Sequence, residues 1–169
     1  MLRIASGETT NATASVRDAI SHTVRLLLPE AARTRVKVGG CDSSLRVHLS
    51  DGELSHVLLN VLLNALKATN TVEGQVDVEV REGMHVGCST RNIGRRMIAI
   101  SVMDSGSGAD GNQLRMCYRT LSWEEGRFVG KNLGTLLCRM IVERAGGQIE
   151  VESSPGKGTT VTVLLPEAG

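Results

Sequence analysis

The stretch at residues 53–67 reads ELSHVLLNVLLNALK, which is strongly apolar yet carries two asparagines four residues apart and ends on a lysine. It holds neither Pro nor Gly, and Asp51 stands where a cap would start it, so a helix is predicted over residues 51–69. At about 100° per residue, the polar side chains fall on one stripe about 80° wide. These side chains are Glu53, His56, Asn60, Asn64 and Lys67.

This polar stripe needs partners if the helix is mostly buried, as its many Leu, Val and Ala residues predict. Burying an amide without a hydrogen-bond partner costs roughly 1–3 kcal/mol. The stripe is therefore expected to face either other polar groups of the protein or a ligand, and the rest of the chain has to distinguish the two.

The amino-acid composition limits the classes of protein to which this chain could belong. A chain of 169 residues with 41% hydrophobic content suits one domain with a sizeable core. The chain has one Trp, one Tyr and one Phe, so the core is expected to be aliphatic, without an aromatic platform for single-stranded nucleic acid. A formal charge of +1 provides no basic excess to bind a phosphate backbone. Nucleic acid is therefore not expected as a partner.

The cysteines and the apolar runs bear on location. The 4 cysteines are far apart and show no metal-ligand spacing, so we expect reduced thiols in the cytoplasm. The N-terminus lacks a hydrophobic signal core, and no apolar run reaches the roughly 20 residues needed to cross a bilayer. We expect no membrane contact by this segment, which could still be the cytosolic part of a larger, membrane-bound protein.

Periodicity predicts a mixture of helices and strands. Further helices are expected at residues 16–28 and 133–145, the second stopped by Gly146 and Gly147. Strands are expected at residues 35–38 and 45–49 around a polar turn, and at 75–80, 97–103, 148–153 and 159–165. Residues 104–134 lack periodicity, as functional lids and disordered loops do. The pattern indicates an α+β fold whose mostly antiparallel sheet has its helices on one face.

Two glycine-containing segments carry chemistry. DSGSG at residues 104–108 follows a strand, so its carboxylate can accept from a ligand amino group while the bare backbone lets the ligand approach. GKNLG at residues 130–134 leads into a helix, whose free N–H groups and positive dipole end attract phosphate. Each signal alone is weak, since glycine turns are common.

In their order along the chain, these segments are more specific. The asparagine helix, DSGSG, a lid, a glycine box opening a helix and GGQIEVESSPGKGTTVTVLLP resemble the ATP-binding catalytic domain of sensor histidine kinases. This family shares its ATPase superfamily with gyrase, the heat-shock chaperone and the mismatch-repair protein. The resemblance covers residues 15–166 and implies one domain over 1–169, a two-layer Bergerat-type α/β sandwich with about three helices and a lid at about 108–132.

The resemblance also implies a site for ATP and Mg²⁺. Asn64 matches the residue whose amide oxygen binds the Mg²⁺ held by the triphosphate, and Mg²⁺ takes few protein ligands. Asn60 matches the other asparagine of that motif, and Lys67 matches a basic residue that reaches phosphate. The alternative is that the asparagines only satisfy buried backbone groups.

The remaining matches lie at the base and at the lid. Asp104 matches the carboxylate that accepts from the adenine amine, and Thr159 matches a hydroxyl at the adenine end. The glycines of the site are Gly106, Gly108, Gly130 and Gly134. Lys131, beside Gly130, either contacts phosphate or is a solvated lid residue. Gly106 and Gly108 match glycines against the base, and Gly130 and Gly134 match glycines flanking the phosphates.

The family's chemistry implies the partners. Such a domain positions ATP and holds no catalytic residue beyond that, because the nucleophile is a histidine on a separate dimerisation domain in cis or in trans. A response regulator is a further partner that the resemblance allows. The isolated domain is expected to be a monomer.

The sequence departs from the family pattern in the glycine box, in the lid and in lacking an acceptor. The box reads GKNLGT where GxGLGL is usual, so Asn132 replaces a glycine, and residues 116–120 lack the usual phenylalanine. His22 lies in SHTVRLLLP, without the acceptor pattern, and His48, His56 and His85 are expected to be surface or structural residues. One alternative is therefore a pseudokinase module that binds nucleotide without transfer. An autonomous ATPase is disfavoured because its water-activating glutamate would stand at Asn60.

Overall fold

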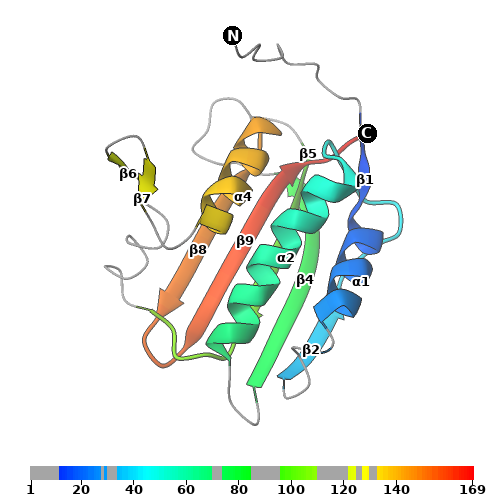
Figure 1. The fold of residues 1–169 in the computed structure, drawn as a ribbon. Helices are drawn as coiled ribbons and strands as arrows, with labels where there is room; N and C mark the ends of the chain where they lie inside the picture. The colour runs from blue at the N-terminus through cyan, green and yellow to red at the C-terminus, as the bar shows by residue number, and fades with distance from the viewer. Residues whose placement is uncertain are drawn as a thin grey trace.

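The computed structural model describes residues 12–27, 29, 34–69, 74–84, 96–109, 122–124, 127–129 and 133–169. Helices on one face of a five-stranded sheet give the described part of the chain two layers (Figure 1). The helices are α1 (Val16–Leu27), α2 (Asp51–Ala68) and α4 (Leu133–Arg144). α2 lies between α1 and α4 and contacts both of them.

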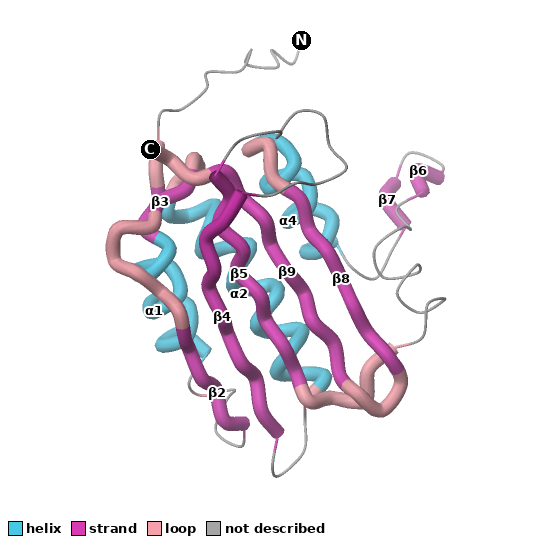
Figure 2. The backbone as a smooth tube through the Cα atoms, turned by 180° about the vertical axis from the view of Figure 1, so that it is seen from behind, coloured by secondary structure: helices cyan, strands magenta, loops and turns pink. Residues whose placement is uncertain are grey.

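The sheet has the order β2-β4-β5-β9-β8 (Figure 2). Its strands are β2 (Thr34–Gly39), β4 (Gly74–Met84), β5 (Arg96–Asp104), β8 (Gln148–Ser154) and β9 (Gly158–Pro166). β2 and β4 are parallel, whereas β4 and β5, β5 and β9, and β8 and β9 are antiparallel. The expected fold class, a mixed and mostly antiparallel sheet with its helices on one face, is confirmed.

One strand pairing differs from the expectation. The strands expected around the polar turn exist, as β2 and β3 (Arg46–Val47), but they do not pair with each other. β3 pairs with β1 (Ala14–Ser15) in a separate sheet and bridges Glu167, while β2 joins β4. The observed pairing buries apolar surface, because Val47 and its partner Ala14 are both 0% exposed.

The start of α2 also differs in detail. Ser50, not Asp51, is the N-cap: its hydroxyl oxygen accepts from the Glu53 backbone N–H at 3.3 Å. The Glu53 carboxylate accepts in turn from the Ser50 backbone N–H at 3.0 Å, which completes a capping box. Asp51 lies exposed in the first turn, where its charge faces the positive end of the helix.

The end of α4 confirms the expected glycine stop. Gly146 has φ 79°, a left-handed angle that glycine adopts without strain. Its N–H donates to the Glu143 carbonyl at 3.0 Å, and the N–H of Gly147 donates to the Val142 carbonyl at 2.8 Å. These two bonds form a Schellman motif and satisfy carbonyls that the helix leaves open.

A short hairpin lies within the segment expected to be irregular. β6 (Ser122–Glu124) and β7 (Arg127–Val129) are antiparallel, with Trp123 opposite Phe128. Aromatic residues favour strands, but three residues are too few to show an alternating pattern.

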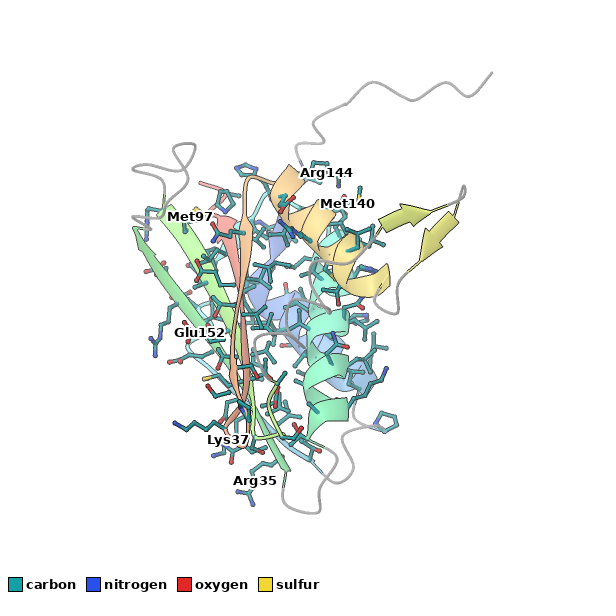
Figure 3. The ribbon with its side chains drawn as sticks, turned by 90° about the vertical axis from the view of Figure 1, so that its left-hand side faces the viewer. Arg35, Lys37, Met97, Met140, Arg144 and Glu152 are labelled. Atoms are coloured by element: carbon teal, nitrogen blue, oxygen red, sulfur yellow. The ribbon has the colours of Figure 1, made fainter. Side chains whose placement is uncertain are left out.

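The core between the layers is aliphatic, as expected. Leu54, Leu58 and Leu62 of α2 are at most 1% exposed and belong to one cluster with Ile98 and Ile100 of β5, both 0% exposed. Figure 3 shows the sheet edge-on, with the helices on one side of it. In the described part of the chain, no helix is long and apolar enough to cross a membrane.

Candidate functional site

Polar side chains form a row across three strands at one end of the sheet. Asp104 on β5 lies opposite Thr159 on β9, which lies opposite Ser153 on β8. Alternation along each strand puts this row on the face that the helices cover. The preceding row on the same face is apolar and consists of Val102, Val161 and Val151. The polar row therefore closes one end of an apolar floor.

The Asp104 carboxylate is held by backbone groups. Its Oδ1 accepts from the Gly106 N–H at 2.9 Å and from the Thr159 N–H at 3.3 Å. Burial raises the pKa of Asp104, and these two hydrogen bonds act against that rise. Within the described ranges no hydrogen bond reaches Oδ2, so this oxygen is available to accept one from a ligand.

Glycines let the loop after Asp104 fit between its neighbours. A Cβ at Gly106 would lie 2.5 Å from the Ala68 carbonyl oxygen at the end of α2. Gly108 has φ 66°, and a Cβ there would collide with the Ser154 carbonyl of the β8–β9 turn. Both glycines are required by close approach of the protein's own backbone, in addition to any approach of a ligand.

Ser153 connects this loop to the β8–β9 turn. Its hydroxyl oxygen accepts from the Ala109 N–H at 2.8 Å, and its proton is donated to the Gly158 carbonyl at 3.0 Å. The hydroxyl groups of Ser153 and Thr159 are 2.8 Å apart. Ser153 stands in none of the sequence motifs, although the alternation of Ile149 and Val151 could have placed it on the inner face.

The polar stripe of α2 runs from half-buried to exposed. Asn60 is half-buried, and its Nδ2 donates to the His56 carbonyl at 3.3 Å and lies 3.3 Å from the ring Nε2 of His56. Because the carbonyl can only accept, the amide nitrogen must be on that side, and Oδ1 lies against Gly134. Asn64 and Lys67 are exposed. The stripe is thus less buried than the helix as a whole.

A shallow hollow lies between α2 and α4 and opens to solvent. Its floor is made by strands β8 and β9, and its full lining is Asn60, Val61, Asn64, Thr135, Cys138, Ile149 and Val161. Burial raises the pKa of Cys138 to about 11, so its thiol is neutral at physiological pH. Both asparagines of the stripe therefore border one largely apolar hollow.

The structure groups the expected site residues in two places. Asn60, Asn64 and Gly134 meet where α2 approaches the start of α4. The other group lies at the end of the sheet and consists of Asp104, Gly106, Gly108 and Thr159. Lys67 lies on α2 between the two groups, because the carbonyl of its neighbour Ala68 lies against Gly106.

Some expectations lie outside the described residues. Among these are Gly130, Lys131 and Asn132 of the glycine box, residues 116–120 of the lid, and His85. Over the part of the chain that is described, no group of three or more His, Cys, Asp or Glu side chains forms a metal site.

Comparison with known sequences identifies relatives. Residues 49–169 match the family described as histidine kinase-, DNA gyrase B- and HSP90-like ATPase. Sensor histidine kinase ZraS of Klebsiella oxytoca is 31% identical over 156 residues, which are 91% of this chain and 31% of that protein. Sensor protein EvgS of Escherichia coli K12 is 30% identical over 132 residues, 75% of this chain and 10% of that protein. The chain thus spans a third or less of the length of these relatives.

Solved structures share the fold. The mycobacterial sensor histidine kinase MprB superimposes with a TM-score of 0.73 at 18% identity, over 94% of this chain and 98% of that one. Full-length ShkA, solved in complex with AMPPNP, superimposes with a TM-score of 0.72 at 20% identity, over 97% of this chain and 32% of that one. These matches establish the two-layer fold of histidine kinase catalytic domains, and the sequence match establishes the family. The chain belongs to the histidine kinase-, DNA gyrase B- and HSP90-like ATPase family.

Proposed function

We propose that this chain is the ATP-binding catalytic domain of a two-component sensor histidine kinase. It would bind Mg-ATP and donate the γ-phosphate to a histidine on a separate dimerisation domain. The observation that carries the proposal is the Asp104 carboxylate at the end of the sheet, with Oδ2 open to a ligand and with α2 leading from there to Asn64. Family membership supports the same activity.

The base end of the site fits adenine. The exocyclic amine of adenine is a donor, and Asp104 Oδ2 is an acceptor whose oxygen partner Oδ1 is already fixed by two backbone N–H groups. A base with a keto oxygen at that position would set an acceptor against the carboxylate, which leaves both unpaired. The site should therefore select adenine over guanine or hypoxanthine.

The phosphate end fits a triphosphate with its metal. Asn64 and Lys67 are exposed on α2, and Gly134 stands in the first turn of α4, where free N–H groups and the positive dipole end favour anions. Mg²⁺ keeps phosphate oxygens and waters in its coordination shell, so Asn64 as one neutral protein ligand is chemically sufficient. Bound ATP would supply the transferable phosphoryl group.

The residues of this chain position ATP and neutralise its charge, and the nucleophile lies on another domain. Asn60 stands where a water-activating glutamate would be needed for autonomous hydrolysis, and an amide cannot take a proton from water. Its nitrogen donates to the His56 carbonyl, which fixes it as a structural group beside Gly134. The proposal includes a single domain that extends over residues 1–169 and has a lid at about residues 108–132.

The first test is calorimetric titration with ATP, with and without Mg²⁺. The wild type should bind, Asp104→Asn should weaken ATP binding, and Asn64→Ala should mainly remove the Mg²⁺ dependence. A charged hydrogen bond contributes about 1.5–3 kcal/mol, so loss of the Asp104 contact should cost roughly ten- to a hundredfold in affinity. A folded wild type that does not bind Mg-ATP would refute the proposal.

The second test separates a kinase from a pseudokinase. Asn132 in the glycine box favours the second possibility, because a side chain there takes space that a glycine leaves free. Radiolabelled ATP and the phosphoacceptor domain of a related kinase such as ZraS should give a labelled histidine if transfer occurs. Binding of ATP without labelling of any acceptor domain supplied would identify a nucleotide-binding module instead.

A further inference from the structure

The Ser153 hydroxyl can be assigned completely from its neighbours. A serine hydroxyl has one proton to donate and two lone pairs to accept with. The Gly158 carbonyl, at 3.0 Å, can only accept, so it takes the proton. The Ala109 N–H, at 2.8 Å, can only donate, so it takes one lone pair. What remains for Thr159, whose hydroxyl oxygen is 2.8 Å away, is the second lone pair of Ser153.

The Thr159 hydroxyl must then be the donor in its contact with Ser153. A threonine hydroxyl also has only one proton, so once it is donated to Ser153 only lone pairs are left on Thr159 for a ligand. Thr159 stands directly opposite Asp104, whose Oδ2 is also an acceptor. The base end of the site is thus lined by two neighbouring groups that accept and do not donate.

We propose that Ser153 is a positioning residue that sets the base specificity of the nucleotide site by fixing the direction of the Thr159 hydroxyl. The proposal rests on the proposed function, because it specifies how the same site chooses its base. Ser153 itself need not touch the nucleotide. It acts through Thr159, and its bond to Ala109 anchors the segment that follows Asp104.

The consequence is stronger discrimination than Asp104 alone would give. A base amine, directly or through a bridging water, can satisfy both acceptors. A keto oxygen at the same place meets two acceptors and no donor. If Ser153 were removed, the Thr159 hydroxyl could rotate and donate its proton to that keto oxygen. Loss of Ser153 should therefore reduce the preference for ATP over inosine triphosphate, which carries the keto oxygen.

The experiment measures binding of ATP and of inosine triphosphate, each with Mg²⁺, by calorimetry. The proteins are the wild type, Ser153→Ala, Thr159→Val, the double variant and Ser153→Thr, each checked for folding by thermal melting. Ser154→Ala is the matched control, because it removes an exposed hydroxyl one residue along the same strand. Thr159→Val keeps the shape of the side chain while it removes the hydroxyl.

Ser153→Ala and Thr159→Val should each lower the ratio of the ATP affinity to the inosine triphosphate affinity by about three- to tenfold, the scale of one hydrogen bond. The double variant should be no worse than either single variant, because both act through one hydroxyl. Ser153→Thr, which keeps the hydroxyl, should restore most of the ratio, and Ser154→Ala should leave it unchanged.

Three results would overturn the proposal. The first is a Ser153→Ala protein with the wild-type ratio when Thr159→Val has lowered it. The second is a double variant whose loss is the product of the two single losses. The third is a folded Ser153→Thr protein that keeps the low ratio of Ser153→Ala. If Ser153→Ala fails to fold, Ser153→Cys replaces it, since a thiol of similar size is only a weak hydrogen-bond partner. A folded wild type that binds neither nucleotide would overturn the proposed function, and this proposal with it.

Discussion

At the residue scale, the half-buried carboxylate of Asp104 lowers the stability of the unliganded protein. Because burial raises its pKa, the folded state holds the proton more tightly than the unfolded state does. The contribution of Asp104 to stability is therefore greatest while its carboxyl is protonated, and this contribution falls as the pH rises from the ordinary carboxyl range through the folded pKa. At neutral pH the charged side chain destabilises the fold, and a donor from a ligand would relieve that effect.

Replacing Asp104 with Asn should separate stability from specificity. The Asn oxygen can keep the hydrogen bonds from Gly106 and Thr159, while its amide group removes the buried charge and turns an acceptor into a donor. We expect the unliganded variant to unfold at higher urea concentration than the wild type at pH 7, with a difference that shrinks toward pH 4. We also expect its nucleotide preference to move toward inosine triphosphate. A variant less stable than the wild type at pH 7 would contradict the cost assigned to Asp104.

At the element scale, the boundaries of α2 and α4 are fixed by a few side-chain contacts. The sequence contained the signal for the true start of α2, a serine followed three residues later by a glutamate, but Asp51 beside it is an equally good cap by residue type. Only the geometry separates the two. Arg144 at the end of α4 pairs with Glu53 of the same capping box, so the start of one helix and the end of the other are joined.

Ser50→Ala should lower the free energy of unfolding by about 1 kcal/mol at pH 7, a typical effect of removing an N-cap. The Ser50 backbone N–H is the main cause that lowers the pKa of Glu53, followed on the lowering side by the Ser50 hydroxyl and Arg144. A lowered carboxyl pKa stabilises the fold above the unfolded pKa, and the contribution is lost as the pH falls through the folded value. Ser50→Ala keeps the backbone N–H and removes only the hydroxyl's share of this lowering, so a part of its effect should disappear in acid.

Asp51→Ala is the matched control in the same urea titrations. Asp51 is exposed and does not cap the helix, so its loss should change the unfolding free energy by less than half as much as Ser50→Ala. Equal effects of the two substitutions would mean that the cap is shared.

The approach of α4 to α2 gives a second prediction at this scale. Glycine to alanine within a helix usually stabilises by roughly 0.5–1 kcal/mol. At Gly134 the new methyl group would collide with Oδ1 of Asn60, whose side chain would have to rotate and lose its hydrogen bond to the His56 carbonyl, so Gly134→Ala should instead destabilise the protein slightly. Adding Asn60→Ala should restore part of the loss. Gly52→Ala, in a helix position with open space around it, is the control and should be neutral or stabilising. Thermal melting of the four proteins measures the effect.

Periodicity predicted the helices and the long strands of the fold, because each has enough residues to show its repeat. It could not predict the pairing of β1 with β3, since two-residue strands show no alternation and their partners are far apart in sequence. The site residues likewise fall into those that the sequence could predict and those that it could not. Asp104 and Asn64 stand in motifs that can be seen in the sequence, whereas Ser153 depends on the register between β8 and β9.

At the scale of the whole molecule, the edges of the sheet bear on association. β2 at one edge carries Arg35 and Lys37, and β8 at the other carries Glu150 and Glu152. A two-fold dimer would pair like edges and therefore like charges, which opposes edge-to-edge association. We expect light scattering to give the mass of one chain, 18.0 kDa. A stable dimer at micromolar concentration would contradict this expectation.

The small β1–β3 sheet has a mechanical consequence. β1 and Glu167 lie on the two sides of β3, both antiparallel to it, and the N–H of Ala168 donates to the Arg46 carbonyl. The Arg46 side chain also holds the carbonyl and hydroxyl oxygens of Thr13. Tension applied between residues 13 and 168 would therefore pull two parallel segments in opposite directions and load this patch in shear. The Glu167 N–H also donates to the Arg96 carbonyl at the start of β5, so the same load would reach the five-stranded sheet at the end opposite to its polar row.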